Sequence, residues 1–207
     1  MTLLVVGSRP SSAAAPPPTL PPEVTTSNAP SPADVDLIVA YCKDGVSRLG
    51  SGDFREVEKA RDFLLAPLNL PGVTGAFRHA YTKALFSRPI DILRYIDGPQ
   101  PHPRINAFRV IENLGTGDAL DAMVERADSS RRPSLDVGGR LWAARAAGTI
   151  LRSTRNSDVI VPSKISKAVR ALGSAAEREP DVNVLRRQFD ALGAVNTTEA
   201  RNELVGA

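Results

Sequence analysis

The side chains best suited to binding chemistry in this sequence are arginines and lysines in its second half. Residues 138–172 contain seven Lys or Arg residues and one acidic residue, Asp158. Arg145 and Arg152 are seven residues apart, which places both on one face of a helix. Further basic residues follow at a spacing of three, so we predict one continuous basic surface across two adjacent helices. Its members are Arg145, Arg152, Lys164, Lys167 and Arg170.

This predicted surface has two interpretations. A solvated helix face is the simpler one, and a docking surface for phosphates or for an acidic protein is the functional one, because guanidinium groups suit such anions. No aromatic residue stands among the basic residues of 164–170, so base stacking is not indicated. Contact with nucleic acid would therefore be made to the phosphate backbone and would weaken with salt.

Trp142 is the single tryptophan and precedes several small residues. We expect it to fill a gap between closely packed helices, and an exposed anchor for a partner is the alternative.

The remaining reactive side chains do not form a recognisable catalytic set. The two histidines, His79 and His102, lack the helical i, i+4 partner typical of a metal site, and His102 is expected in a loop between two prolines. Cys42 lies in an apolar helical stripe and is interpreted as a core residue. A single cysteine also excludes a disulfide within the chain. No catalytic residue, cofactor site or metal site is predicted.

Helices must position these residues. Apolar residues make up 42% of the 207 residues but aromatic residues only 5%, so Ala and Leu do most of the filling, which favours helices over sheets. Apolar periodicity predicts about nine helices. They include a helix over 54–64 whose inward-facing residues begin with Phe54, a short helix over 89–96, a helix over 104–114 and a helix capped by Ser163. Short Gly- or Pro-marked connections require antiparallel neighbours. The expected fold class is all-α, with helical hairpins stacked as a short α-α superhelix, although closure as a bundle stays open.

Two repeats support stacked hairpins. The words at 49–53 (LGSGD) and 114–118 (LGTGD) are nearly identical and are interpreted as one turn used twice, the first glycine taking the left-handed cap position. In addition, the offsets 0, 3, 7 and 10 recur from Arg104, Arg140 and Val182, whose starts lie 36 and 42 residues apart.

Over roughly residues 103–194 the chain resembles HEAT-like repeats. The likeness is carried by His102-Pro103-Arg104 with the helix to Leu114, by Gly117-Asp118-Ala119-Leu120, and by residues 140–147 (RLWAARAA). The resemblance implies an α-α superhelix used for binding, and it transfers no catalytic residue.

The N-terminal part has a different composition. Residues 1–31 are rich in Pro, Ala and Ser and are expected to form a disordered, extended tail before a helical domain at 32–207. Apolar residues 2–7 and small residues 11–15 leave a remnant signal peptide as the alternative. A cytoplasmic location is slightly favoured, and export is expected if that alternative holds. No stretch approaches the roughly 20 apolar residues of a membrane helix.

The sequence therefore favours a non-enzymatic scaffold that binds a protein partner whose identity stays open. Binding of nucleic acid through the basic second half is the first alternative, and an enzyme-associated subunit is the second. The net charge of +3 is too small to decide between them.

Overall fold

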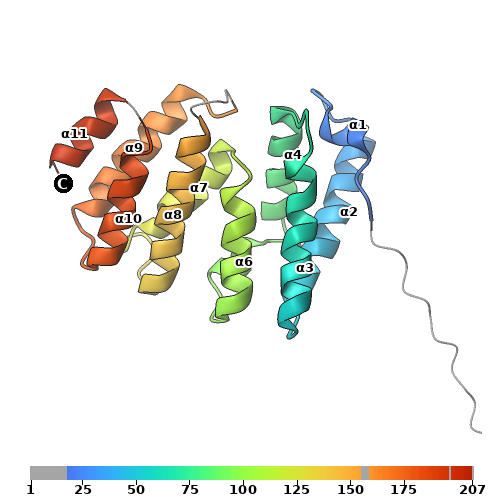
Figure 1. Ribbon diagram of the computed structural model, residues 1–207, viewed down its shortest axis with the longest axis horizontal. Coiled ribbons are helices and arrows are strands. Elements are labelled where there is room, and N and C mark those ends of the chain that lie inside the picture. Colours follow the sequence, from blue (N-terminus) through green and yellow to red (C-terminus); the bar gives the residue numbers. More distant parts are fainter. Residues whose placement is uncertain (1–17, 155–158, 196, 207) are drawn as a thin grey trace, which may run out of the picture.

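The computed structural model describes residues 18–154, 159–195 and 197–206, and every regular element in these ranges is a helix (Figure 1). The prediction of an all-α fold is confirmed. The longer helices are α2 Pro32–Leu49, α3 Phe54–Leu65, α4 Gly75–Phe86, α6 Pro101–Glu112, α7 Gly117–Ala127, α8 Val137–Ser153, α9 Pro162–Ala176, α10 Val182–Leu192 and α11 Thr198–Gly206. The short elements are α1 Pro22–Thr25, the 3₁₀ helix η1 Ala66–Asn69 and α5 Leu93–Ile96.

The longer helices lie in two rows. In one row, α3, α6, α8 and α10 follow one another side by side, as Figure 1 shows. In the other row, α2 packs on α4, α7 on α9, and α9 on α11. The rows pack together through the pairs α2–α3, α7–α8 and α9–α10, which are consecutive in the chain. The connections of α2–α3 (residues 50–53) and α9–α10 (residues 177–181) are short, which forces antiparallel packing, whereas α7 and α8 are joined by the longer segment 128–136.

One hydrophobic core runs between the rows, from Val24 to Ala200. Cys42 belongs to it with no exposed surface, as the sequence predicts. Small residues on α8 allow close packing, since a Cβ added to Gly148 would lie 3.1 Å from the Cα of Ala191 on α10. Burying apolar side chains along the whole length of the array supplies most of the driving force for folding.

Two arginines, each the fourth residue of its helix, connect successive helices of the first row. Arg104, near the start of α6, donates from Nε to the carbonyl of Gly98 at 3.0 Å, and its Nη1 pairs with Asp136, the N-cap of α8, at 2.6 Å. Arg140, near the start of α8, donates from Nη1 to the carbonyl of Leu135 at 2.9 Å. Its Nη2 also pairs at 3.0 Å with Glu179, which stands shortly before α10. The same arrangement therefore occurs twice along the row.

Residues 18–31 lie on the domain, although the sequence analysis assigns them to the tail. They contain α1, in which Val24 and Thr25 are buried. The backbone N–H of Thr74 donates to the carbonyl of Thr25 at 3.2 Å and fixes the segment beside the start of α4. Pro22 is compatible with a helix because it occupies the first helical position. The expectation for residues 1–17, including the signal-peptide alternative, falls outside the described residues.

The repeated turn does not have the same geometry in its two copies. Gly115 has φ +65°, the left-handed conformation expected, but Gly50 has φ −83°. Gly50 is required for a different reason, because a Cβ there would lie 2.5 Å from the hydroxyl of Tyr95. Asp53 caps α3 in the first copy, whereas Thr116 caps α7 in the second. The following helix therefore begins after the aspartate in the first copy but at the second glycine in the second copy.

Two helices begin earlier than the sequence predicts. Pro101 is the first residue of α6, so His102 lies in the first helical turn and not in a loop. Likewise Pro162 is the first residue of α9, and no side chain caps that helix, although Ser163 was the expected cap. The fixed φ of proline suits the first helical turn, which explains both starts.

The segment 87–92 departs from the predicted helix over 89–96. Asp91 has φ +42°, which is incompatible with a right-handed helix, and the helix α5 begins only at Leu93. The proline at the expected start therefore lies in a turn.

Candidate functional site

A groove with a volume of about 310 Å³ lies between α8 and α10 and is lined by three arginines. Arg145 and Arg152 project from α8, and Arg187 projects from α10. Gly148 of α8 and Ala191 of α10 also line it and carry almost no side chain, which lets the two helices approach closely. We call this feature the arginine groove. Of the five basic residues predicted from the sequence, it contains the first two.

The charges of the arginine groove are only partly balanced. Arg187 pairs with Asp190 one helical turn away at 3.1 Å, and both side chains are about half exposed. The Nε of Arg145 lies 3.8 Å from Oε2 of Glu112, beyond hydrogen-bonding distance. Within the part of the chain that the structure describes, no carboxylate pairs with Arg152, which is exposed. The groove therefore presents an excess of positive charge to solvent.

Trp142 borders this surface and has features of both roles considered for it. Its indole is half-buried and stacks against Phe108 of α6, with ring centroids 6.3 Å apart. The guanidinium of Arg145 covers the ring at 4.6 Å from the centroid, a cation–π contact. The tryptophan is thus a packing residue whose outer face is shared with an arginine of the groove.

The basic residues of α9 have acidic neighbours. Lys164 bonds to Asp118 of α7 at 2.7 Å and lies 3.4 Å from Asp121, and the hydrogen bond to Asp118 raises the pKa of the lysine. Lys167 shares a small cavity of about 180 Å³ with Asp121 and Glu125 of α7 and with Arg131, and Glu125 itself pairs with Arg132 at 2.8 Å. The carboxylates of α7 therefore offset the charge of Lys164, whereas no ion pair joins Lys167 or Arg170 to a carboxylate among the described residues.

The five predicted basic residues consequently form two groups and not one continuous surface. We call the second group, Lys164, Lys167 and Arg170, the lysine face. The main neighbours of α8 are α6, α7 and α10, whereas those of α9 are α7, α10 and α11, so consecutive helices α8 and α9 belong to different rows. The prediction assumed that helices adjacent in sequence are adjacent in space, which holds within a hairpin but not between hairpins.

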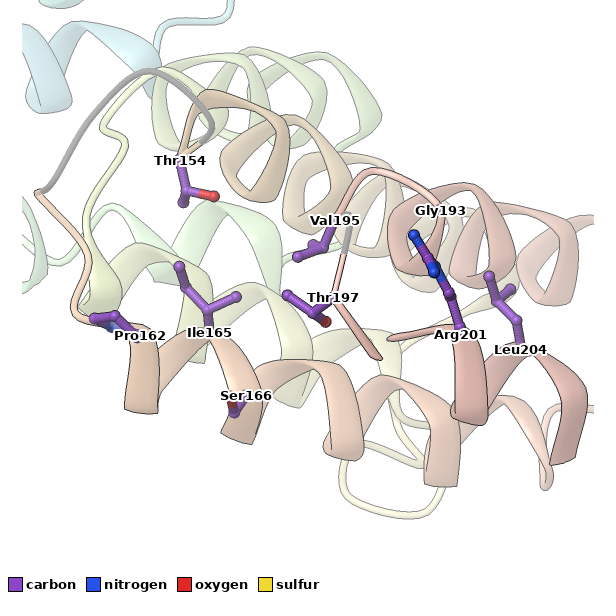
Figure 2. Close-up of a pocket in the computed structure, with 9 residues that line it drawn as sticks. All are labelled: Thr154, Pro162, Ile165, Ser166, Gly193, Val195, Thr197, Arg201 and Leu204. Atoms are coloured by element: carbon purple, nitrogen blue, oxygen red, sulfur yellow. The ribbon is translucent and has the colours of Figure 1, made fainter. Parts of the chain in front are cut away.

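The opposite flank of α9 borders a larger cavity of about 700 Å³, which Figure 2 shows. Ile165 points into it from α9, and Thr197 lies across from it before α11. Arg201 and Leu204 of α11 complete the far side. The lining mixes apolar and polar groups, and the lysine face is not part of it.

The histidines lie apart from both groups. His79 is exposed, as the sequence predicts. His102 stacks on Phe54, with ring centroids 4.5 Å apart, beside an apolar pocket of about 440 Å³. Phe54, the first residue of α3, is 67% exposed, whereas the sequence predicts that it faces inward. The described residues contain no group of three or more His, Cys, Asp or Glu that could hold a metal ion.

Arg187 belongs to the arginine groove but was not predicted from the sequence. Its helix carries the third copy of the offset pattern, but the pattern marks inward positions and gives no information on which outward residues meet. One signal in the sequence did indicate that a helix packs closely on α8. Gly148 and the alanines around it are small residues, which allow such a close approach.

None of the described helices is long and apolar enough to cross a membrane. Comparisons with protein-family models, with curated proteins and with solved structures returned no match.

Proposed function

We propose that this protein is a non-enzymatic scaffold of HEAT-like helical repeats that binds a protein partner, and that an acidic segment of the partner lies in the arginine groove. The observation that carries the proposal is the convergence of Arg145, Arg152 and Arg187 on one groove with a single carboxylate, Asp190, in its lining. Guanidinium groups bind carboxylates through two parallel hydrogen bonds, which gives direction as well as charge.

The two rows of helices and the repeated arginine contacts support the repeat assignment. Arg104 and Arg140 occupy the same position in the offset pattern and make the same two kinds of contact. In a stacked array each repeat contacts mainly its neighbours, so such contacts are expected to recur at each junction.

The dimensions of the groove favour an extended acidic peptide. Arg145 and Arg152 are separated by two helical turns, which corresponds to about 10 Å along α8. On a polyproline II chain, which has three residues per turn and rises about 3.1 Å per residue, side chains three residues apart share a face and are about 9 Å apart.

Titration of two fluorescein-labelled probes tests the proposal: a twelve-residue polyglutamate peptide and a twelve-base-pair DNA duplex. We expect the peptide to bind, with the fluorescence of Trp142 changing as Arg145 moves on its ring. The double charge reversal Arg152→Glu/Arg187→Glu should weaken binding at least about tenfold, because it replaces two attractions by repulsions.

The matched control is Lys167→Glu/Arg170→Glu on the lysine face, which changes the net charge by the same amount. The proposal requires this variant to retain peptide binding within about twofold of the unmodified protein, since net charge alone acts weakly at a distance. Equal losses for the two variants would contradict it. Tighter binding of the duplex than of the peptide, with a steep salt dependence, would favour the nucleic-acid alternative.

A further inference from the structure

A second polar pocket, with a volume of about 260 Å³, lies between the end of α6 and the C-terminal half of α8. It is separate from the arginine groove, because Thr149 and Ser153 line it from α8 while Gly148 and Arg152 line the groove. Its lining also includes Glu112 of α6, Arg78 of α4 and the backbone at Gly115. The pocket thus contains one acidic and one basic side chain.

Glu112 is a buried acid without a hydrogen bond. Its side chain is 10% exposed, and its Oε2 atom is buried with no hydrogen-bond partner. The nearest cation is Arg145, whose Nε lies 3.8 Å away and whose guanidinium rests on Trp142. Burial raises the pKa of the Glu112 carboxyl, and the attraction of Arg145 offsets this only in part. A buried polar group without a partner is destabilising, so native structures seldom leave one.

Arg78 is a cation without an acidic partner. Its guanidinium donates to the carbonyls of Asn113 at 2.9 Å and Leu114 at 3.1 Å, and to the carbonyl of Leu68 at 3.1 Å. These bonds hold the group in place, and they leave part of its donor capacity unused. Among the described residues no carboxylate pairs with it, and burial lowers the pKa of the guanidinium.

The rest of the lining leaves room and supplies acceptors. Gly115 has φ +65°, and a Cβ there would lie 3.7 Å from Oγ of Ser153 and 3.8 Å from Nη1 of Arg78, so the missing side chain keeps the pocket open. Ser153 donates its hydroxyl hydrogen to the carbonyl of Ile150 at 2.7 Å, and Thr149 donates to that of Arg145 at 3.2 Å. Both hydroxyl oxygens therefore remain acceptors toward the pocket.

We propose that this pocket binds a small zwitterion, an amino acid, whose ammonium group meets Glu112 and whose carboxylate meets Arg78. The two residues line one pocket but form no ion pair with each other. A ligand with one charge would satisfy one residue and be repelled by the other, whereas a zwitterion satisfies both. The hydroxyl oxygens of Thr149 and Ser153 accept further hydrogen bonds from the ammonium group. This site goes beyond the scaffold function and does not depend on it.

An NMR titration of the ¹⁵N-labelled protein tests the proposal with glycine, β-alanine and 4-aminobutanoate. These probes carry the same two charges at increasing separation, so the tightest one reports the distance between the two protein charges. We expect saturable shifts of the backbone amides of Gly115, Thr149 and Ser153. The methyl ester and the N-acetyl derivative of the tightest probe should each bind at least about tenfold more weakly, because each removes one charge-assisted contact.

Glu112→Gln should also weaken the tightest probe about tenfold, since it keeps the shape and removes the charge. Glu125→Gln on α7, the same substitution away from the pocket, is the control and should leave binding unchanged. Circular dichroism of both variants checks that they fold. The proposal is overturned if none of the three amino acids gives saturable shifts at these residues. It is also overturned if the ester and the N-acetyl form bind as tightly as the free amino acid.

Discussion

The arginine groove and the lysine face carry the same number of predicted or observed basic residues but differ in their surroundings. Lys164 is within 3.4 Å of two aspartates of α7, whereas Lys167 and Arg170 form no ion pair with a carboxylate among the described residues. In the groove, Arg152 has no acidic partner among the described residues, and Arg145 is 3.8 Å from the nearest one. The two regions therefore differ in where their acidic partners come from: the neighbouring helix α7 supplies those of Lys164, whereas Asp190 on α10 itself supplies that of Arg187.

The contrast has a structural cause in the order of the rows. The lysine face belongs to the row in which α7 precedes α9, and α7 carries several exposed acids. The groove belongs to the row of α6, α8 and α10, in which the acidic Glu112 is buried. Four substitution experiments test this comparison of the arginine groove with the lysine face.

The first compares a buried ion pair at the start of α8, outside the arginine groove, with the exposed ion pair of the lysine face. Arg140→Met leaves Glu179 fully buried without its cation and should lower the free energy of unfolding by about 3–5 kcal/mol. Lys164→Met removes a half-exposed pair and should cost less than about 1 kcal/mol. Chemical denaturation measures both values. Similar losses would mean that the two pairs do not differ in burial as the structure shows.

The second tests the orientation of α9, on which the lysine face depends. Leu172 is fully buried, so Leu172→Ala should lower the free energy of unfolding by about 2–5 kcal/mol through lost burial and a cavity. Lys167 is exposed on the other side, and Lys167→Ala should change it by less than about 0.5 kcal/mol. Denaturation curves of the two variants decide, and a large effect at Lys167 would place it in the core.

The third asks whether Glu112 neutralises the arginine groove. Because burial raises the pKa of Glu112, the folded state favours the protonated form, and the ionised form is destabilising above that pKa. Glu112→Gln should therefore match or exceed the unmodified protein in stability at pH 7. The difference should shrink as the pH falls through the raised pKa toward the ordinary value of 4.5.

Denaturation midpoints at several pH values measure this effect. If Glu112→Gln instead destabilises the protein at pH 7, Glu112 and Arg145 form an effective ion pair. The groove would then carry less free charge than the comparison assigns to it.

The fourth expects the smallest effect. Asp118→Asn/Asp121→Asn removes the partners of Lys164 and should make the lysine face more attractive to anions. We expect polyglutamate to bind about twofold to fivefold more tightly, because exposed ion pairs are weak. The control Asp36→Asn/Glu58→Gln removes the same charge from exposed positions on α2 and α3. A gain of the same size in the control would reduce the effect to net charge.

Periodicity and end signals predicted most of the helices because these signals are local. The helix expected over 54–64 is observed as α3, and Cys42 is buried as expected, since an apolar stripe acts within a few residues. Prolines at the first helical position were harder to interpret. Pro101 and Pro162 start their helices earlier than expected, because proline is compatible with the first turn but also marks loops.

The candidate site was predicted only in part, because its residues come from segments far apart in the chain. Arg145 and Arg152 could be placed on one helix face from their spacing alone. Arg187 is 35 residues beyond Arg152 in the sequence and meets it only because α10 packs on α8. The pairing of Lys164 with Asp118 spans 46 residues and likewise needs the contact of α7 with α9.

The sequence by itself determined that this chain forms helices, which face of each helix is apolar, and where short connections force hairpins. These properties follow from side-chain periodicity and from hydrogen bonding within a few residues. The tertiary structure alone decided which hairpins lie side by side, and therefore which charges neutralise one another and which remain exposed. That decision depends on contacts between distant segments, and its physical basis is the packing of apolar faces, which carry no record of the charges on the opposite side.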